Sequence, residues 1–179
     1  MKRIIVLTSV ASLLMLVFIS SCKLLDVNKE FELEIEFSPY DADPVLYAEE
    51  DFDAAEASSV ISDYGDLIKS IEVTEASYLV TSFTATSGMT LTNSLLQVAN
   101  PDGSDVQTLA SEWIAKPEDH MVTPQVFTVE QAGLDKLENL LMNPPHQVRF
   151  IVSGTSDAAP VDFDFKIILK VKLVANPLD

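Results

Sequence analysis

Hydrophobic and polar residues alternate strictly in two segments near the ends of the chain. In residues 31–37, apolar side chains occupy every odd position and glutamates occupy the even ones. In residues 161–173, valine, phenylalanine, isoleucine or leucine fills every odd position. A period of two predicts a strand with one buried face and one wet face. We therefore expect a β-strand at each place, and the second would be roughly 43 Å long at about 3.3 Å per residue.

Shorter patterns between these strands predict the rest of the fold. Runs rich in β-branched and aromatic residues indicate strands at residues 71–83, 89–99, 106–113 and 146–154. The first three resemble a β-meander, and a change of phase after Val73 indicates a bulge or burial on both faces. The segment 38–51 has two prolines, several acids and no periodicity, which is typical of an exposed loop.

Two segments have apolar residues three or four positions apart, the spacing of a helix face. One covers residues 53–70, and the other runs from Val129 to Leu141, where Thr128 and Gln131 have the spacing of a capping box. Many strands with only two isolated helices favour a mainly β domain, and a two-sheet β-sandwich with two short helices suits the pattern best. The alternative fold class is α+β.

The charged faces of the first and last strands are complementary. The first strand offers Glu32, Glu34 and Glu36, and the last offers Lys166, Lys170 and Lys172. Opposite charges on neighbouring strands contribute roughly 0.2–1 kcal/mol each. We therefore predict that the two strands are neighbours in one sheet, the alternative being two unrelated solvated faces.

The first residues predict export. Lys2 and Arg3 are followed by sixteen uncharged residues, and the small residues Ser20 and Ser21 precede Cys22, the only cysteine. A basic start, an apolar run and small residues are the features of a secretory signal peptide. Sixteen helical residues span roughly 24 Å, less than a hydrocarbon core of about 30 Å. Cleavage is therefore a better interpretation than a permanent membrane span.

The sequence Ile19-Ser20-Ser21-Cys22 resembles the lipobox of bacterial lipoproteins, with isoleucine in place of the usual leucine. The resemblance implies cleavage before Cys22 and acylation of its sulfur, so residues 1–21 would be a signal peptide, 22–29 a short tether and 30–179 a single domain. The layout also resembles small β-sandwich lipoproteins of Bacteroidota. Because Lys23 stands where an aspartate would imply retention in the inner membrane, this resemblance implies a lipid anchor in the outer membrane.

The charge limits the partners. Removal of residues 1–21 takes away two bases and no acid, which moves the formal net charge from −17 to −19. From Glu30 to Asp66 there is no lysine or arginine. Nucleic acid is therefore a poor partner, since phosphate binding requires clustered bases.

Two sites are conceivable in this acidic stretch. Oxygen ligands for Ca²⁺ could come from Asp41, Asp43, Glu49, Glu50, Asp51 and Asp53.

Exposed aromatic rings are the second kind of candidate site. Tyr40 and Tyr47 lie in the acidic stretch and could contact a glycan or a peptide. Trp113, at the end of a predicted strand, is expected in the core, because large aromatic residues are mostly buried. An unbound, solvated acidic loop is the plain alternative for the whole region.

The sequence contains none of the common catalytic motifs that we looked for. The chain contains no P-loop, dinucleotide fingerprint, HExxH or Gly-x-Ser-x-Gly sequence, and its two histidines, His120 and His146, lack partners at metal-binding spacing. We expect a non-catalytic envelope domain without a cofactor, which acts through protein contacts or structural assembly at the outer membrane. The alternatives are a surface module that binds glycan or depends on calcium, and an enzyme that uses one of the histidines.

Overall fold

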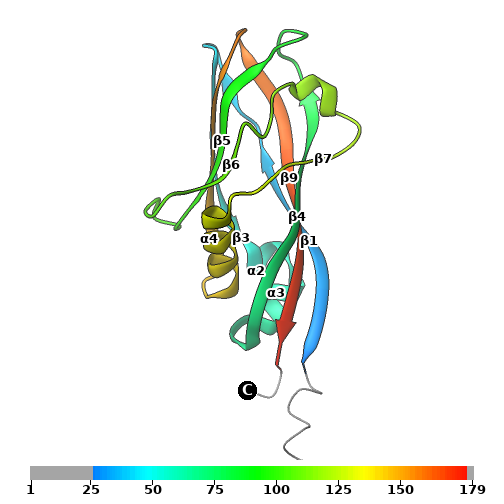
Figure 1. Cartoon of the computed structure of the whole chain (residues 1–179), viewed down its shortest axis with the longest axis vertical. Helices are drawn as coiled ribbons and strands as arrows, with labels where there is room; N and C mark the ends of the chain where they lie inside the picture. Colours follow the sequence, from blue (N-terminus) through cyan, green and yellow to red (C-terminus); the bar gives the residue numbers. More distant parts are fainter. Residues whose placement is uncertain (1–25, 177–179) are drawn as a thin grey trace, which may run out of the picture.

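Two antiparallel sheets make up most of the computed structural model, which describes residues 26–176 (Figure 1). One sheet has the strand order β1-β9-β4-β7, with β2 also paired to β9, and the other has the order β3-β8-β5-β6. The strands of the first sheet are β1 (Val27–Phe37), β2 (Tyr40–Asp41), β4 (Ile68–Phe83), β7 (Gln125–Val126) and β9 (Val161–Ala175). Those of the second are β3 (Val45–Asp53), β5 (Leu91–Ala99), β6 (Gln107–Ser111) and β8 (Gln147–Ser156).

The predicted mainly β, two-sheet sandwich is confirmed. If β1 and β2 count as one strand, the sheets read 1-8-3-6 and 2-7-4-5 in chain order, which is the arrangement of a jelly roll. The predicted meander is wrong in its first member, because β4 belongs to one sheet and β5 and β6 to the other. Alternation along a strand shows which side is buried but not which sheet the strand joins.

The predicted pairing of the first and last strands is confirmed. β1 and β9 are antiparallel over the whole of β1, with Glu32 opposite Lys170 and Glu36 opposite Lys166. β4 flanks β9 on its other side, and its register shifts after Val73, which confirms the predicted bulge. β1 begins at Val27, three residues before the expected start of the domain at residue 30.

Of the two predicted helical segments, the first is broken into short pieces and the second is a continuous helix. The first is broken into α2 (Ala54–Ala57), α3 (Ser59–Tyr64) and the 3-10 turn η2 (Gly65–Leu67), and β4 already starts at Ile68. Ser58 is extended and Gly65 has φ 31°, so the helix is interrupted at both places. The second is α4 (Gln131–Met142), and η3 (Pro117–His120) is a further 3-10 turn.

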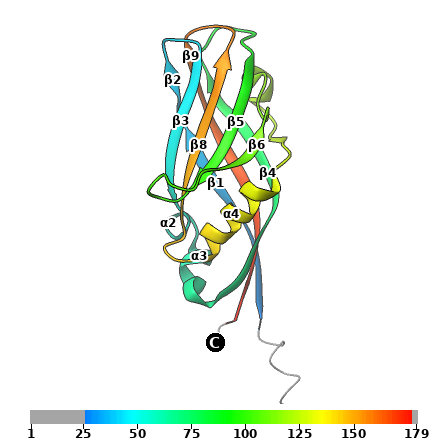
Figure 2. The same cartoon turned by 60° about the vertical axis from the view of Figure 1, so that its left-hand side comes forward.

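The predicted capping box before α4 is wrong. The N-cap is Glu130, whose side chain makes no capping bond. Its N–H donates to the carbonyl oxygen of Leu109 at 2.7 Å, and its carboxylate accepts from Ser111 Oγ at 2.6 Å. The chain before α4 is therefore tied to β6 instead of folding back on the helix. α4 then lies between the lower parts of β4 and β6 (Figure 2).

The core lies between the sheets and is filled by the inward side chains of both. Phe37 of β1 and Phe165 of β9 stack with ring centroids 4.9 Å apart. Trp113 is 6% exposed and packs edge-on against Tyr78, which confirms its expected place in the core. Within residues 26–176, no helix has the length and apolar character needed to span a membrane.

A tyrosine-lined groove as candidate functional site

β1 and β2 behave as one edge strand with a gap at Ser38 and Pro39. Phe37 lies opposite Phe165 and Tyr40 lies opposite Asp162, so the register along β9 is the same on both sides of the gap. Proline has no N–H to donate to a sheet ladder, which explains why the pairing stops there. The alternation of burial nevertheless continues, and Tyr40 points to the wet side.

β3 forms the edge of the other sheet, and its residues were predicted to be a loop. That prediction is wrong, because β3 pairs with β8 from Val45 to Asp53. Leu46 is fully buried and Tyr47 is exposed, as alternation requires. Glu50 has the same phase as Leu46 and yet is exposed. The polar residue at this inward position hid the strand in the sequence.

A groove of about 400 Å³ lies between these two sheet edges. We call it the tyrosine groove. Its lining residues come from both edges and are Glu36, Phe37, Ser38, Pro39, Tyr40, Tyr47, Ala48, Glu49 and Glu50. The structure thus brings together Tyr40 and Tyr47, the two tyrosines that the sequence offered as contacts. Tyr40 is 71% exposed and Tyr47 is 54% exposed, unlike the fully buried Tyr78 of the core.

The carboxylates of the groove are only partly compensated. The Tyr47 hydroxyl donates to Glu49, and this hydrogen bond is the main reason why the pKa of Tyr47 is raised. Glu49 also lies 4.0 Å from Nη1 of Arg149. Within residues 26–176, neither Glu36 nor Glu50 takes part in an ion pair. Lys166, which lies opposite Glu36, instead bonds to Glu34 at 2.7 Å.

The six acids proposed as calcium ligands are spread along β2, β3 and the turn between them. Asp41 accepts the backbone N–H of Asp43 at 2.9 Å, and Glu49 and Glu50 line the groove. Asp51 is held by Nε and Nη2 of Arg149 at 2.6 and 2.9 Å, a bidentate pair that lowers the pKa of Asp51.

Asp53 has a local structural role. It caps α2 through the N–H groups of Ala55 and Glu56 and accepts a bond from Gln147 at 2.8 Å. The bond from Gln147 contributes most to its lowered pKa. In the part of the chain that the structure describes, no three acidic, histidine or cysteine side chains are grouped as a metal site requires. The geometry therefore gives the calcium hypothesis no support.

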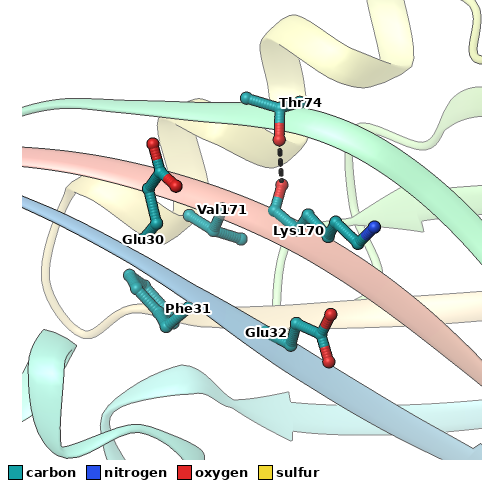
Figure 3. Close-up of a pocket in the computed structure, with 6 residues that line it drawn as sticks. All are labelled: Glu30, Phe31, Glu32, Thr74, Lys170 and Val171. Atoms are coloured by element: carbon teal, nitrogen blue, oxygen red, sulfur yellow. Dashed lines mark hydrogen bonds between the residues drawn. The ribbon is translucent and has the colours of Figure 1, made fainter.

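A second depression, of about 260 Å³, lies on the outer side of the first sheet (Figure 3). It is lined by Glu30, Phe31, Glu32, Thr74, Lys170 and Val171. Here the Thr74 hydroxyl donates to the carbonyl oxygen of Lys170 at 3.2 Å, beside the bulge of β4. The charges on this surface are partly compensated, because its lysine, Lys170, bonds to Glu75 at 2.8 Å, which raises the pKa of Lys170.

The same compensation extends along three strands. Lys170 lies between Glu32 of β1 and Glu75 of β4, and Lys172 lies between Glu30 and Glu72. We call this surface the paired face and define it by Glu30, Glu32, Glu34, Glu72, Glu75, Lys166, Lys170 and Lys172. Lys166 and Lys170 form ion pairs there with Glu34 and Glu75, whereas the lining of the tyrosine groove has no lysine or arginine. The paired face is therefore a less suitable site for a cationic ligand than the tyrosine groove.

Neither histidine lines the tyrosine groove or the depression on the paired face. His146 is buried, and its Nδ1 lies 2.8 Å from the carbonyl oxygen of Leu141 at the end of α4. The His120 ring packs edge-on against Tyr78 at 5.3 Å. Both contacts fit a packing role. Cys22 lies outside the described residues.

Sequence reasoning missed Glu36 as a site residue, because it was read only as part of the charged face of β1. The available signal was the absence of any base between Glu30 and Asp66, together with two tyrosines near the end of that face. A strand edge brought next to β3 by the jelly-roll topology could not be read from either segment alone.

The fold and site define a jelly-roll domain with an acidic, tyrosine-lined groove at one edge. No protein-family profile and no curated protein matches the sequence. Among solved structures, a chain of turnip yellow mosaic virus is 9% identical with a TM-score of 0.41, over 87% of this chain and 82% of that chain. A chain of Desmodium yellow mottle tymovirus is 9% identical with a TM-score of 0.33, over 86% and 85%. Similarity this low carries no functional argument, and the jelly-roll assignment rests on the strand order itself.

Proposed function

We propose that this protein is a lipid-anchored, non-catalytic binding domain of the outer membrane, which contacts a protein partner through the tyrosine groove. The observation that carries the proposal is the exposure of Tyr40 and Tyr47 in one groove whose carboxylates are incompletely compensated. Tyrosine is enriched at protein interfaces, because it adds a large contact area and a polar end while losing little conformational freedom. An exposed pair of such rings in a concave site supports a binding role.

The distance between the anchor and the groove also supports this role. Cys22 precedes the first strand residue, Val27, by five positions, so the tether can reach only about 17 Å. β1 then runs for ten residue steps to Phe37, or roughly 33 Å. β2 lies toward the end of the sandwich opposite to the start of β1 (Figure 2). Acylation of Cys22 would therefore hold the groove well away from the membrane, where a partner can reach it.

The surroundings of the histidines favour binding over catalysis. General acid or base work needs a titrating group within hydrogen-bond reach of a substrate. His146 is buried and engaged with a backbone carbonyl, and His120 packs on a core ring. The groove itself offers tyrosines and glutamates without a partnered nucleophile, which suits recognition.

A crosslinking experiment tests the proposal. The full-length lipoprotein is produced in its own host with a photoreactive phenylalanine analogue at position 47, and in parallel at position 122, where Val122 is 90% exposed and remote in sequence from the groove. We expect one discrete protein adduct from position 47, reduced by the Y40A substitution, and no such adduct from position 122. Equal adducts from both positions, or none from position 47, would contradict the proposed site.

The anchor is tested separately. Mass spectrometry of the N-terminal peptide from native membranes should find Cys22 acylated, and the C22A variant should lose stable membrane attachment. An unmodified thiol would refute the anchored part of the proposal and leave the groove to be judged on the crosslinks.

A further inference from the structure

We infer that the tyrosine groove takes an extended segment of its partner that carries lysine or arginine side chains. This inference rests on the proposed function and names the kind of partner. Three features of the groove support it independently: its charge, its aromatic rings and the free sheet edges on both of its sides.

The negative charge of the groove favours a cationic ligand. Glu36, Glu49 and Glu50 line it, and its lining contains no lysine or arginine. Concave sites lined by charges of one sign concentrate the field and attract ligands of the opposite sign. Two cations lie nearby and both are engaged, Arg149 with Asp51 through two hydrogen bonds and Lys166 with Glu34 at 2.7 Å. A basic side chain would therefore find two glutamates without an ionic partner.

The aromatic rings add a second attraction for the same ligand. Arginine and lysine are drawn to the faces of tyrosine rings within about 6 Å of the ring centre. Tyr40 and Tyr47 come from opposite sides of the groove and are both more than half exposed. A cationic side chain that enters between them can contact a ring and a carboxylate at once.

The edges explain why the segment should be extended. β1 with β2 ends the first sheet, and β3 ends the second. The free side of an edge strand presents N–H and C=O groups that have no partner in the sheet, and an extended peptide can pair with them. A globular surface or a compact cation would leave these groups unused. A neutral glycan could stack on the rings but would leave Glu36 and Glu50 uncompensated.

Binding of a defined probe tests the inference. The probe is a fluorescent twelve-residue peptide that alternates arginine and threonine, and its match has glutamate in place of each arginine. The full-length lipoprotein is purified in neutral detergent and titrated by fluorescence anisotropy. We expect the arginine peptide to bind and the glutamate peptide not to bind. Affinity should fall on the order of tenfold between 50 and 300 mM salt, since exposed charges are screened.

Matched variants locate the contact. The E36Q/E50Q variant removes two charges from the groove and should weaken binding on the order of tenfold, as should Y40A/Y47A. The control is E30Q/E32Q, which removes the same number of charges from the paired face and should change affinity less than about twofold. Melting curves check that all variants remain folded; both tyrosines and both groove glutamates are exposed, so the fold does not depend on them.

The outcomes separate the two proposals. Equal loss of affinity in E30Q/E32Q would mean attraction by the net charge alone and would overturn the inference. Displacement of the fluorescent arginine peptide by neutral glycans, but not by the same peptide without the label, would also overturn the inference. If the peptide fails to bind while position 47 still crosslinks to a partner, the basic segment is wrong and the binding function stands. If both experiments fail, both proposals fall.

Discussion

Two glutamate-rich surfaces of this domain share the strand β1 and differ in what faces their carboxylates. On the paired face, Lys170 and Lys172 of β9 each lie between acids of β1 and β4, and Lys166 and Lys170 form ion pairs with Glu34 and Glu75. In the tyrosine groove, near the end of the same strand, Glu36 meets Glu49 and Glu50 of β3 and two exposed rings. The acids alone do not distinguish a binding site from a structural surface.

The difference comes from the neighbours that the topology supplies. Glu34 bonds to Lys166 of the neighbouring strand and becomes part of the sheet. Glu36 lies opposite the same lysine without an ion pair to it and lines the groove with the acids of β3, so its charge is available for a partner. Substitutions beneath and within the two surfaces test this difference.

Disturbing the core beneath both surfaces should affect both. A Cβ on Gly133 of α4 would lie 2.2 Å from the backbone oxygen of Thr108, so the G133A variant forces α4 away from β6. Overpacking of this kind costs about 3 kcal/mol. Urea denaturation should show this loss, whereas the control N139A, at an exposed position of the same helix, should change stability by less than about 0.7 kcal/mol. A G133A variant as stable as the wild type would mean that α4 does not pack so closely.

Charge reversal should damage the paired face. The K166E variant removes the 2.7 Å bond to Glu34 and places a third acid beside Glu34 and Glu36. We expect a loss of about 1–2 kcal/mol in the free energy of unfolding. The control is K116E, which makes the same charge change at an exposed residue outside the sheets. Equal effects of the two variants would show that the loss comes from net charge and not from the strand pairing.

Acid should reveal the structural role of the Asp53 carboxylate at the end of β3. Its pKa is lowered below 3.8 by the bond from Gln147 and by the N–H groups of α2. A depressed pKa gives stability that is complete above about 3.8 and lost as the pH falls through the lower folded value. The D53N variant keeps a capping side chain without the charge, so it should be less stable than wild type at neutral pH. The difference in stability should shrink as the pH falls below 3.8 and through the lower folded pKa of Asp53, and a gap that stays constant over this range in denaturation curves would contradict this account.

The smallest effect is the most direct contrast between the two surfaces. E34Q and E36Q change the same residue type on the same face of β1. E34Q loses its bond to Lys166 and should cost about 0.2–1 kcal/mol, whereas E36Q has no ion pair to lose and should change stability by less than about 0.5 kcal/mol, with stabilisation as the expected sign. The reverse order in chemical denaturation would show that Glu36 is the structurally bound carboxylate.

The sequence predicted those parts of the fold in which alternation continues without a break. The partnership of β1 and β9 followed from Glu32 and Lys170 and their neighbours, and the bulge in β4 from the phase change after Val73. The strand β3 was not predicted, because the polar residue Glu50 occupies an inward position. At that point the inner side of the strand faces the groove instead of the core, so a polar residue is tolerated there.

The sequence predicted the residues of the candidate site only in part, because the site depends on which strands become neighbours. Tyr40 and Tyr47 were identified as exposed rings, but their common groove depends on two edges that meet only after the chain has formed β2 and β3. The acids proposed for calcium lie in a stretch of sequence without lysine or arginine, which drew attention to them. What the sequence could not show is that Asp51 and Asp53 find Arg149 and Gln147 across the strand pair, which leaves Glu50 without such a partner.

Amide chemical-shift mapping tests the central claim most directly. The full-length chain is labelled with ¹⁵N, placed in a small lipid nanodisc and titrated with the arginine peptide. The largest shifts are expected at residues 38–40 and 47–50, with little change around Glu30 and Glu32. Shifts centred on the paired face, or spread evenly over the acidic surface, would contradict the account.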